Sequence, residues 1–206
     1  MKLPGVGEQF VRAHLYDASG TITSGGTAQL VLGQSQSRSY FFFQNTSLGP
    51  LNLEIGSARA TATITNGVVT SVTLKNAGFN FTLPPLIRFL GGGNIGNSSY
   101  IGLGQPGAPA PSNVAQAQAV MTGSAPNQSV SSITVNYGGG GYACAPYVFI
   151  GNDPKDPNGC AVPSATSGIV IPAGGTFVME NSVVTTDPVA VYGASTGQSF
   201  ICKWSD

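Results

Sequence analysis

The chain has 206 residues, of which 41% are apolar, and its eight basic and eight acidic side chains cancel at neutral pH. This composition supports a folded core, but it provides no apolar run long enough to span a membrane and no basic face for releasing counterions from nucleic acid. Twenty-nine glycines and 14 prolines indicate short strands joined by many turns, and a surface so poor in charge favours a protein that works within an assembly.

The N-terminal segment, residues 1–10, lacks the apolar stretch of a secretory signal, so we expect a protein that is made and used without export. The same residues are expected to form either an extended arm on a neighbouring subunit or a frayed terminus. His14, the one histidine, follows in a run typical of a strand, and no nucleophile elbow accompanies it. We interpret His14 as a surface or interface residue and not as a general base.

Three strands are expected in the next stretch, at residues 27–32, 39–45 and 51–55. The third alternates between apolar and polar residues, so its leucines and isoleucine should face a core while Asn52 and Glu54 face solvent. The run of three phenylalanines in the second predicts a strand that is covered on both faces.

The middle of the chain contains an internal repeat, with one copy at residues 58–91 and the other at residues 115–152. Each copy has an alanine-alternating strand, a turn, a second strand, a glycine corner, an aromatic residue, a proline and a third strand. The two corners are equivalent at Gly78 and Gly139, and the aromatic residues at Phe81 and Tyr142.

The pattern of each copy has a physical interpretation. The glycine permits a left-handed corner, the aromatic side chain fills the core beside it, and the proline lies where no ladder donor is needed. We expect the two copies to pack face to face as one small β domain within residues 58–164, with residues 91–113 as the loop between them.

Motifs that could carry chemistry are few. The three cysteines match neither a disulfide framework nor the paired spacings of a zinc site, so we expect reduced and mostly buried thiols, with a bridge between Cys144 and Cys160 as the alternative. Residues 91–96 and 102–107 match the letter of the dinucleotide fingerprint, but no helical pattern follows either one. Residues 152–159 are rich in the oxygens that calcium accepts, but they lack the EF-hand spacing and are expected to form a turn. No catalytic, cofactor-binding or metal-binding residue is predicted.

The C-terminal part shows the same pattern of short apolar segments between turn residues, with expected strands at residues 168–171, 176–180, 189–192 and 199–204. Each end of the chain is too short to build a stable core alone. The simplest solution is an all-β fold in which the two ends pair into one β-sandwich or barrel, with the repeat domain inserted between them. The expected domains are an arm at 1–10, a discontinuous sandwich or barrel at 11–57 plus 165–206, and the insertion at 58–164.

These residues carry a resemblance to known proteins. The order Ala-x-Ala, then Gly-Val-Val-Thr-Ser-Val-Thr-Leu at 67–74, then a corner, an aromatic residue and Pro-Pro resembles a repeat common in tailed-bacteriophage structural proteins, where it usually reads Gly-x-Gly-Tyr-x-x-x-Pro. The first copy departs from that form, with Ala-Gly-Phe-Asn-Phe at 77–81. The segments 38–47, 169–177 and 197–204 are similar to small phage virion proteins that serve in capsid decoration, head fibres or the neck.

The resemblance implies a non-enzymatic virion protein, assembled in the bacterial cytoplasm. The leading hypothesis is a capsid decoration protein that binds copies of itself, with a trimer as one candidate, and the major capsid protein or other virion proteins. A neck or tail collar, fibre or adaptor and a glycan-binding attachment module are the alternatives, whereas nucleic acid and membrane are not expected as partners. If exposed, aromatic residues would be the interface anchors; the candidates are Tyr40, Phe42, Phe79, Phe81, Tyr142, Tyr147 and Trp204.

Overall fold

The computed structural model describes residues 14–93, 113–180 and 184–206, and its regular structure is all β. The expected arm at 1–10 and most of the loop at 91–113, with the second glycine motif, lie outside the described residues. Within the described ranges, no helix is long and apolar enough to cross a membrane. In chain order the strands are β1 (Leu15–Asp17), β2 (Gly20–Thr21), β3 (Ala28–Leu32), β4 (Tyr40–Asn45), β5 (Leu51–Ile55), β6 (Arg59–Thr65), β7 (Val68–Asn76), β8 (Leu86–Leu90), β9 (Gln116–Thr122), β10 (Ser129–Tyr137), β11 (Tyr147–Gly151), β12 (Ile169–Ile171), β13 (Thr176–Glu180), β14 (Val189–Gly193) and β15 (Ser199–Ser205).

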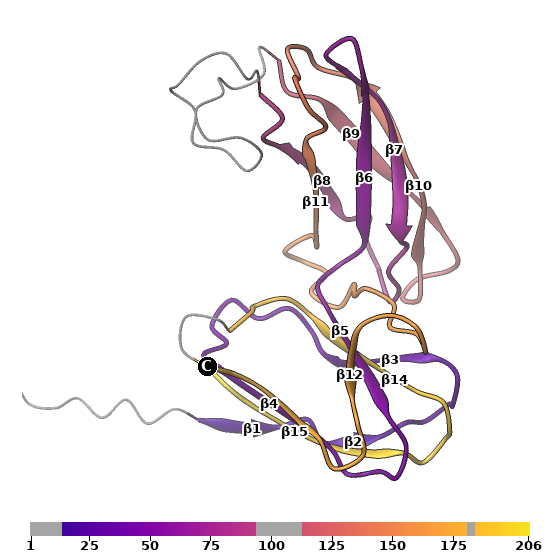
Figure 1. Cartoon of the computed structure of the whole chain (residues 1–206), viewed down its shortest axis with the longest axis vertical. Helices are drawn as coiled ribbons and strands as arrows, with labels where there is room; N and C mark the ends of the chain where they lie inside the picture. Colours follow the sequence, from indigo (N-terminus) through magenta and orange to yellow (C-terminus); the bar gives the residue numbers. More distant parts are fainter. Residues whose placement is uncertain (1–13, 94–112, 181–183) are drawn as a thin grey trace, which may run out of the picture.

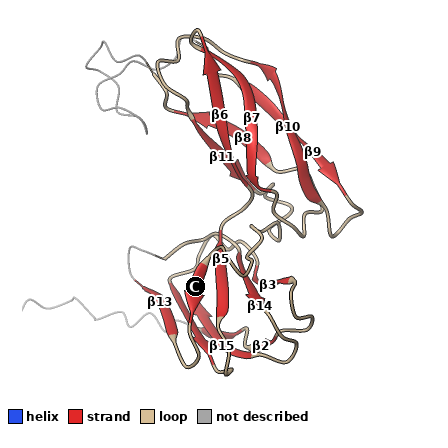
Figure 2. Cartoon of the chain, turned by 45° about the vertical axis from the view of Figure 1, so that its right-hand side comes forward, coloured by secondary structure: helices blue, strands red, loops and turns tan. Residues whose placement is uncertain are grey.

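The strands fall into two groups, one built from both ends of the chain and one from its middle (Figures 1 and 2). We name the first group the terminal sandwich, residues 14–57 and 165–206. One of its sheets has the order β1-β15-β4-β13, with β2 beside β15, and the other has the order β12-β5-β14-β3. Every hydrogen-bonded neighbour joins an N-terminal strand to a C-terminal one, which confirms the predicted pairing of the two ends. The buried core between the sheets includes Ile22, Leu32, Phe41, Phe43, Leu51, Leu53, Ile171, Val189, Val191, Phe200 and Cys202.

Two expectations for the N-terminal strands are wrong. Asn52 and Glu54 of β5 are buried and do not face solvent, because the segment that leads into β12 covers the outer side of this strand. The amide of Asn52 donates hydrogen bonds to the backbone carbonyls of Ser164 and Ser167, at 2.7 and 3.2 Å. In β4 the phenylalanine run is covered on one face only, since the central Phe42 stays partly exposed.

The second group, named the central lobe, comprises residues 58–93 and 113–164. It has a four-stranded sheet of order β7-β6-β11-β8 and the hairpin β10-β9. The expected face-to-face packing of the two repeats is wrong, because the second repeat contributes a strand to the sheet of the first. The third strand of the second copy, β11, lies between the first and third strands of the first copy, β6 and β8.

The β8–β11 ladder relates the two repeats by a local two-fold axis. Arg88 of β8 and Phe149 of β11 occupy equivalent repeat positions, and these two residues face each other at the centre of the β8–β11 ladder. Two backbone hydrogen bonds at the ends of the lobe are related by the same symmetry. The Val69 amide donates to the Gly138 carbonyl at 2.9 Å, and the equivalent Val130 amide donates to the Ala77 carbonyl at 3.0 Å. The two copies therefore share one core and neither is closed without the other.

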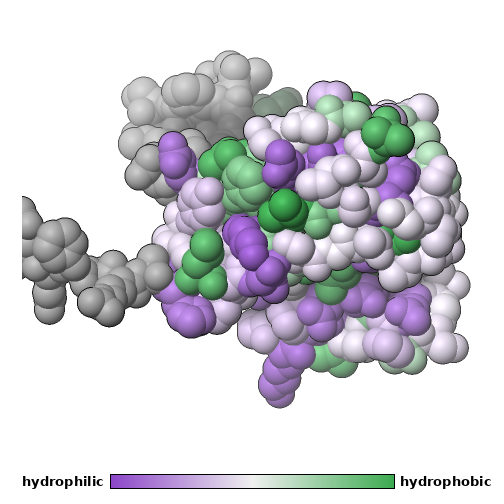
Figure 3. Space-filling view, turned by 90° about the horizontal axis from the view of Figure 1, so that it is seen from below, coloured by the Kyte–Doolittle hydropathy of each residue, from purple (hydrophilic) through white to green (hydrophobic). Residues whose placement is uncertain are grey.

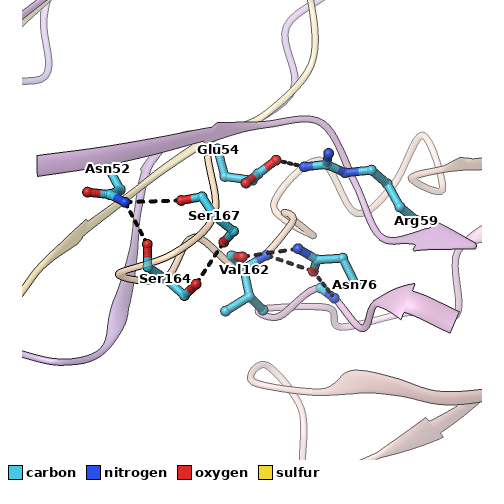
Figure 4. Close-up of polar contacts among 8 residues, drawn as sticks. Asn52, Glu54, Arg59, Asn76, Val162, Ser164 and Ser167 are labelled. Atoms are coloured by element: carbon cyan, nitrogen blue, oxygen red, sulfur yellow. Dashed lines mark hydrogen bonds and ion pairs between the residues drawn. The ribbon is translucent and has the colours of Figure 1, made fainter. Parts of the chain in front are cut away.

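A polar network joins the sandwich to the lobe where the chain passes between them (Figure 4). The carboxylate of Glu54 pairs with the guanidinium of Arg59, across the boundary between β5 and β6. The side-chain amide of Asn76 donates to the Val162 carbonyl at 3.0 Å and accepts from the Val162 amide at 2.9 Å. The two crossings of the chain are joined directly by the Ala161 amide, which donates to the Gly56 carbonyl at 2.8 Å, and by Asn52, which donates to the Ser164 carbonyl.

Candidate interaction surfaces

Two of the seven predicted interface aromatics belong to the core of the central lobe. Phe81 and Tyr142 are only 0% and 4% exposed. Each ring fills the space against its own glycine corner, and the Tyr142 hydroxyl accepts a hydrogen bond from the Ala115 amide at 2.8 Å. Both residues are therefore unavailable as surface anchors, and their prediction as interface residues is corrected.

Two further candidates are partly buried by local contacts. Phe79 forms a backbone bridge with Cys160, with N–O distances of 2.8 and 3.0 Å in the two directions, which ties the first glycine corner to the returning chain. Trp204 packs against the sandwich core, and Tyr16 stacks on its indole with ring centroids 4.3 Å apart. His14 in turn meets Tyr16 edge to face at 4.5 Å and is exposed. Since Tyr16 occupies one face of the indole, Trp204 is not an open platform for a sugar ring.

The structure brings Tyr40 and Phe42 together on the outer face of the β1-β15-β4-β13 sheet. Their neighbours Phe41 and Phe43 point to the core, so alternation places Tyr40 and Phe42 on the opposite side. Phe42 lies directly across from Val178 of β13 and from Lys203 of β15, and Tyr40 lies across from Glu180. The exposed Ile201 belongs to the same side of β15. We name this surface, formed by Tyr40, Phe42, Val178, Glu180 and Ile201, the terminal face.

A view from below the molecule shows hydrophobic side chains among polar ones on the side where the sandwich lies (Figure 3). At the β1 edge of the terminal sheet, a basic side chain and an acidic side chain neutralise each other. There the Lys203 ammonium contacts the Asp17 carboxylate at 2.6 Å. The hydrogen bond from Lys203, followed by those from Ser19, holds the pKa of Asp17 well below its usual range.

The remaining candidate, Tyr147, lies on the outer face of the four-stranded sheet of the central lobe. Tyr147 and Phe149 are 56% and 41% exposed, whereas the intervening Val148 is buried. On the adjacent strand, Leu86 and Arg88 are also exposed. These residues share one side of the sheet by strand alternation. We name the surface formed by Leu86, Arg88, Tyr147 and Phe149 the central face.

A pocket of about 670 Å³ adjoins the central face. Its lining comes from β6 and from the segment that enters β11, and it includes the small residues Ala60 and Ala62 together with Pro146 and Tyr147. Beside this pocket, β6 and β11 are paired at two positions, Thr61 with Tyr147 and Ala60 with Val148. It gives an apolar recess beside an exposed aromatic ring.

Sequence reasoning missed Leu86, Phe149, Val178 and Ile201 as surface residues. Their signal was present in the alternation of each strand, since every one of them is adjacent in sequence to a buried or partly buried position. The signal could not be used without knowing which side of each strand faces the core, because both sides carry apolar residues.

The oxygen-rich turn at 152–159 has a structural role. One carboxylate oxygen of the buried Asp156 accepts hydrogen bonds from the backbone amides of Thr82 and Leu83, at 2.6 and 2.8 Å. Asn152 donates to the Gly159 carbonyl at 2.7 Å and closes the turn. In the described part of the chain, no three side chains of His, Cys, Asp or Glu gather in a way that could hold a metal ion.

Comparison with known proteins found no matching family, no matching curated protein and no matching solved structure.

Proposed function

We propose that this chain is a non-enzymatic structural protein of a tailed-bacteriophage virion, and that it acts as a capsid decoration protein that stabilises the head shell. The proposal is supported mainly by one observation. The central face carries exposed apolar and aromatic side chains, and the terminal face carries the exposed Val178 and Ile201 beside the half-buried rings of Tyr40 and Phe42. Such faces are typical of proteins that bind other proteins.

Two further features agree with a role in assembly. The chain has few charged residues, and its interleaved repeats form a shared β core with residues suited to packing. The repeat pattern also resembles that of phage structural proteins, and a virion protein must hold its shape while it is bound on several sides. A scaffold alone does not determine where on the particle the protein lies.

The test uses the particle that carries the protein. We expect cryo-electron microscopy of the purified virion to show its density on the outer shell in hundreds of copies. We also expect particles without the protein to lose resistance to heat or to low salt. Six or twelve copies at the portal end would instead establish a collar or adaptor. Absence of the chain from purified particles would contradict a virion function.

A further inference from the structure

The two β groups differ in the sign of their charge. The described residues of the central lobe carry four basic and two acidic side chains, and its strands β6 to β11 carry Arg59, Lys75 and Arg88 with no acidic residue. The described residues of the terminal sandwich carry five acidic and two basic side chains. The formal net charge of zero therefore conceals a molecule with a basic lobe and an acidic sandwich.

Each face carries one charge of the corresponding sign among its apolar residues; Lys203, which lies beside Phe42 on the same side of the terminal sheet, is paired with Asp17. On the central face Arg88 lies directly across from Phe149, and on the terminal face Glu180 lies across from Tyr40. Both side chains are exposed. Among the described residues, neither one forms an ion pair or a side-chain hydrogen bond. Each face therefore presents an apolar surface with a charge that no described residue neutralises.

We propose that the central face of one copy binds the terminal face of a second copy, with Arg88 opposite Glu180. Contact would remove Tyr147, Phe149 and Leu86 from water against Phe42, Val178 and Ile201. The opposite charges would fix the register and favour this pairing over others. This contact would be the self-association expected of a virion protein, and its biological meaning rests on the proposed function.

Charge also argues against the simplest alternative, a symmetric dimer through the central face. In an isologous contact the same patch meets itself. Arg88 lies at the centre of the β8–β11 ladder, so a two-fold axis there would bring two guanidinium groups together, and neither β8 nor β11 contains an acidic residue to separate them. A heterologous contact avoids this repulsion, and it leads either to a closed ring, of which a trimer is the smallest, or to an open chain.

The test is a charge exchange in the purified full-length chain, measured by sedimentation equilibrium and velocity. We expect the unmodified protein to form species larger than a dimer, and to dissociate as salt rises from about 0.05 M to about 0.5 M. Arg88→Glu and Glu180→Arg should each weaken association by about tenfold or more. Combining both substitutions in one chain should restore it, because the pair is then reversed.

A mixture of the two single variants provides a second measurement that does not depend on the double variant. Each variant repels itself, because its two faces carry charges of the same sign. In the mixture, the acidic central face of the Arg88→Glu chain matches the basic terminal face of the Glu180→Arg chain, so the mixture should associate where each variant alone does not. Lys155→Glu is the matched control, since this exposed residue lies in the turn at 152–159 and on neither face. It should leave association unchanged.

The inference is overturned if the unmodified protein sediments as a monomer at all concentrations, or if neither the double variant nor the mixture recovers association. These results are independent of the particle experiment. A protein found on virions that remains monomeric in solution would contradict the contact but not the proposed function. A protein that associates through this contact but is absent from virions would contradict the proposed function alone.

Discussion

At the scale of single residues, burial determines the chemistry of the thiols. All three cysteines are unpaired; Cys160 and Cys202 are buried, and Cys144 is partly exposed. Desolvation raises the pKa of Cys160 from 9.0 to about 12, against the backbone hydrogen bond from Ala161. Desolvation likewise raises the pKa of Cys202 to about 12, against the positive charge of Arg38. The reduced thiols expected from the sequence are present, and two of them are protected from ionisation.

We therefore predict that one thiol per native chain, Cys144, reacts rapidly with an alkylating reagent at about pH 8, and that all three react after unfolding. Mass spectrometry of the labelled peptides identifies the site, and Cys144→Ser should abolish the rapid phase. Equally rapid labelling of Cys160 or Cys202 would contradict their burial.

The same pKa shifts give a sign for the pH dependence of stability. Because these thiols ionise later in the folded chain than in the unfolded one, the free energy of unfolding should fall as pH rises from 9.0 towards about 12.

At the scale of the structural element, the glycine corner is the feature that both repeats share. Gly78 and Gly139 have φ angles of 64° and 67°, in the left-handed region. A Cβ atom at Gly78 would lie 2.5 Å from the Phe81 ring, and one at Gly139 would lie 2.5 Å from the Asn113 carbonyl oxygen and 2.9 Å from the Tyr142 ring. The corner thus requires glycine for two reasons, the backbone angle and the space taken by the aromatic ring and, at Gly139, by the neighbouring backbone.

Gly78→Ala and Gly139→Ala should each lower the free energy of unfolding by about 2–4 kcal/mol, which combines left-handed strain with overpacking. Gly174→Ala is the matched control, because Gly174 has a φ angle of 73° but nothing within 4 Å of the added Cβ. This substitution should lower the free energy of unfolding only by the left-handed backbone strain, about 1–2 kcal/mol. Urea denaturation measures all three. Equal losses at Gly78 and Gly174 would show that the aromatic contact contributes nothing.

The elements also show how far the sequence predicts this fold. The strands at 51–55 and 176–180 were located to the residue, because alternation and turn residues are local signals. The choice of partner was not predictable in the same way. The insertion of β11 between β6 and β8 depends on contacts between distant repeats, and the burial of Asn52 depends on a segment more than a hundred residues away. Charge reversal between the two faces became visible only when the outward side of each strand was known.

At the scale of the whole molecule, the chain contains two cores with separate membership. The buried cluster of the sandwich takes residues only from the two ends of the chain, and the cluster of the lobe takes residues only from its middle. Because N-terminal and C-terminal strands alternate throughout the sandwich, neither end can form a sheet by itself. The lobe, in contrast, interrupts the sandwich at a single place, between β5 and β12.

The two ends of that interruption lie close together, because β5 and β12 are antiparallel neighbours with Leu53 opposite Ile169. We predict that replacing residues 58–163 with a short Gly-Ser linker leaves a folded sandwich. The deletion keeps Ser164 and Ser167, whose carbonyls satisfy Asn52, but it removes Arg59 and leaves the Glu54 carboxylate without its partner. Adding Glu54→Gln should therefore stabilise the shortened chain, whereas in the full chain it should not, since there it breaks the ion pair.

Circular dichroism and urea denaturation of both shortened chains provide the measurement. We expect the full chain to unfold in two transitions. The shortened chain should unfold in one cooperative transition, with the same midpoint as one of those two. The outcome that contradicts it is a shortened chain with no cooperative transition, which would mean that the sandwich depends on contacts with the lobe, such as the Ala161–Gly56 backbone hydrogen bond, for its stability.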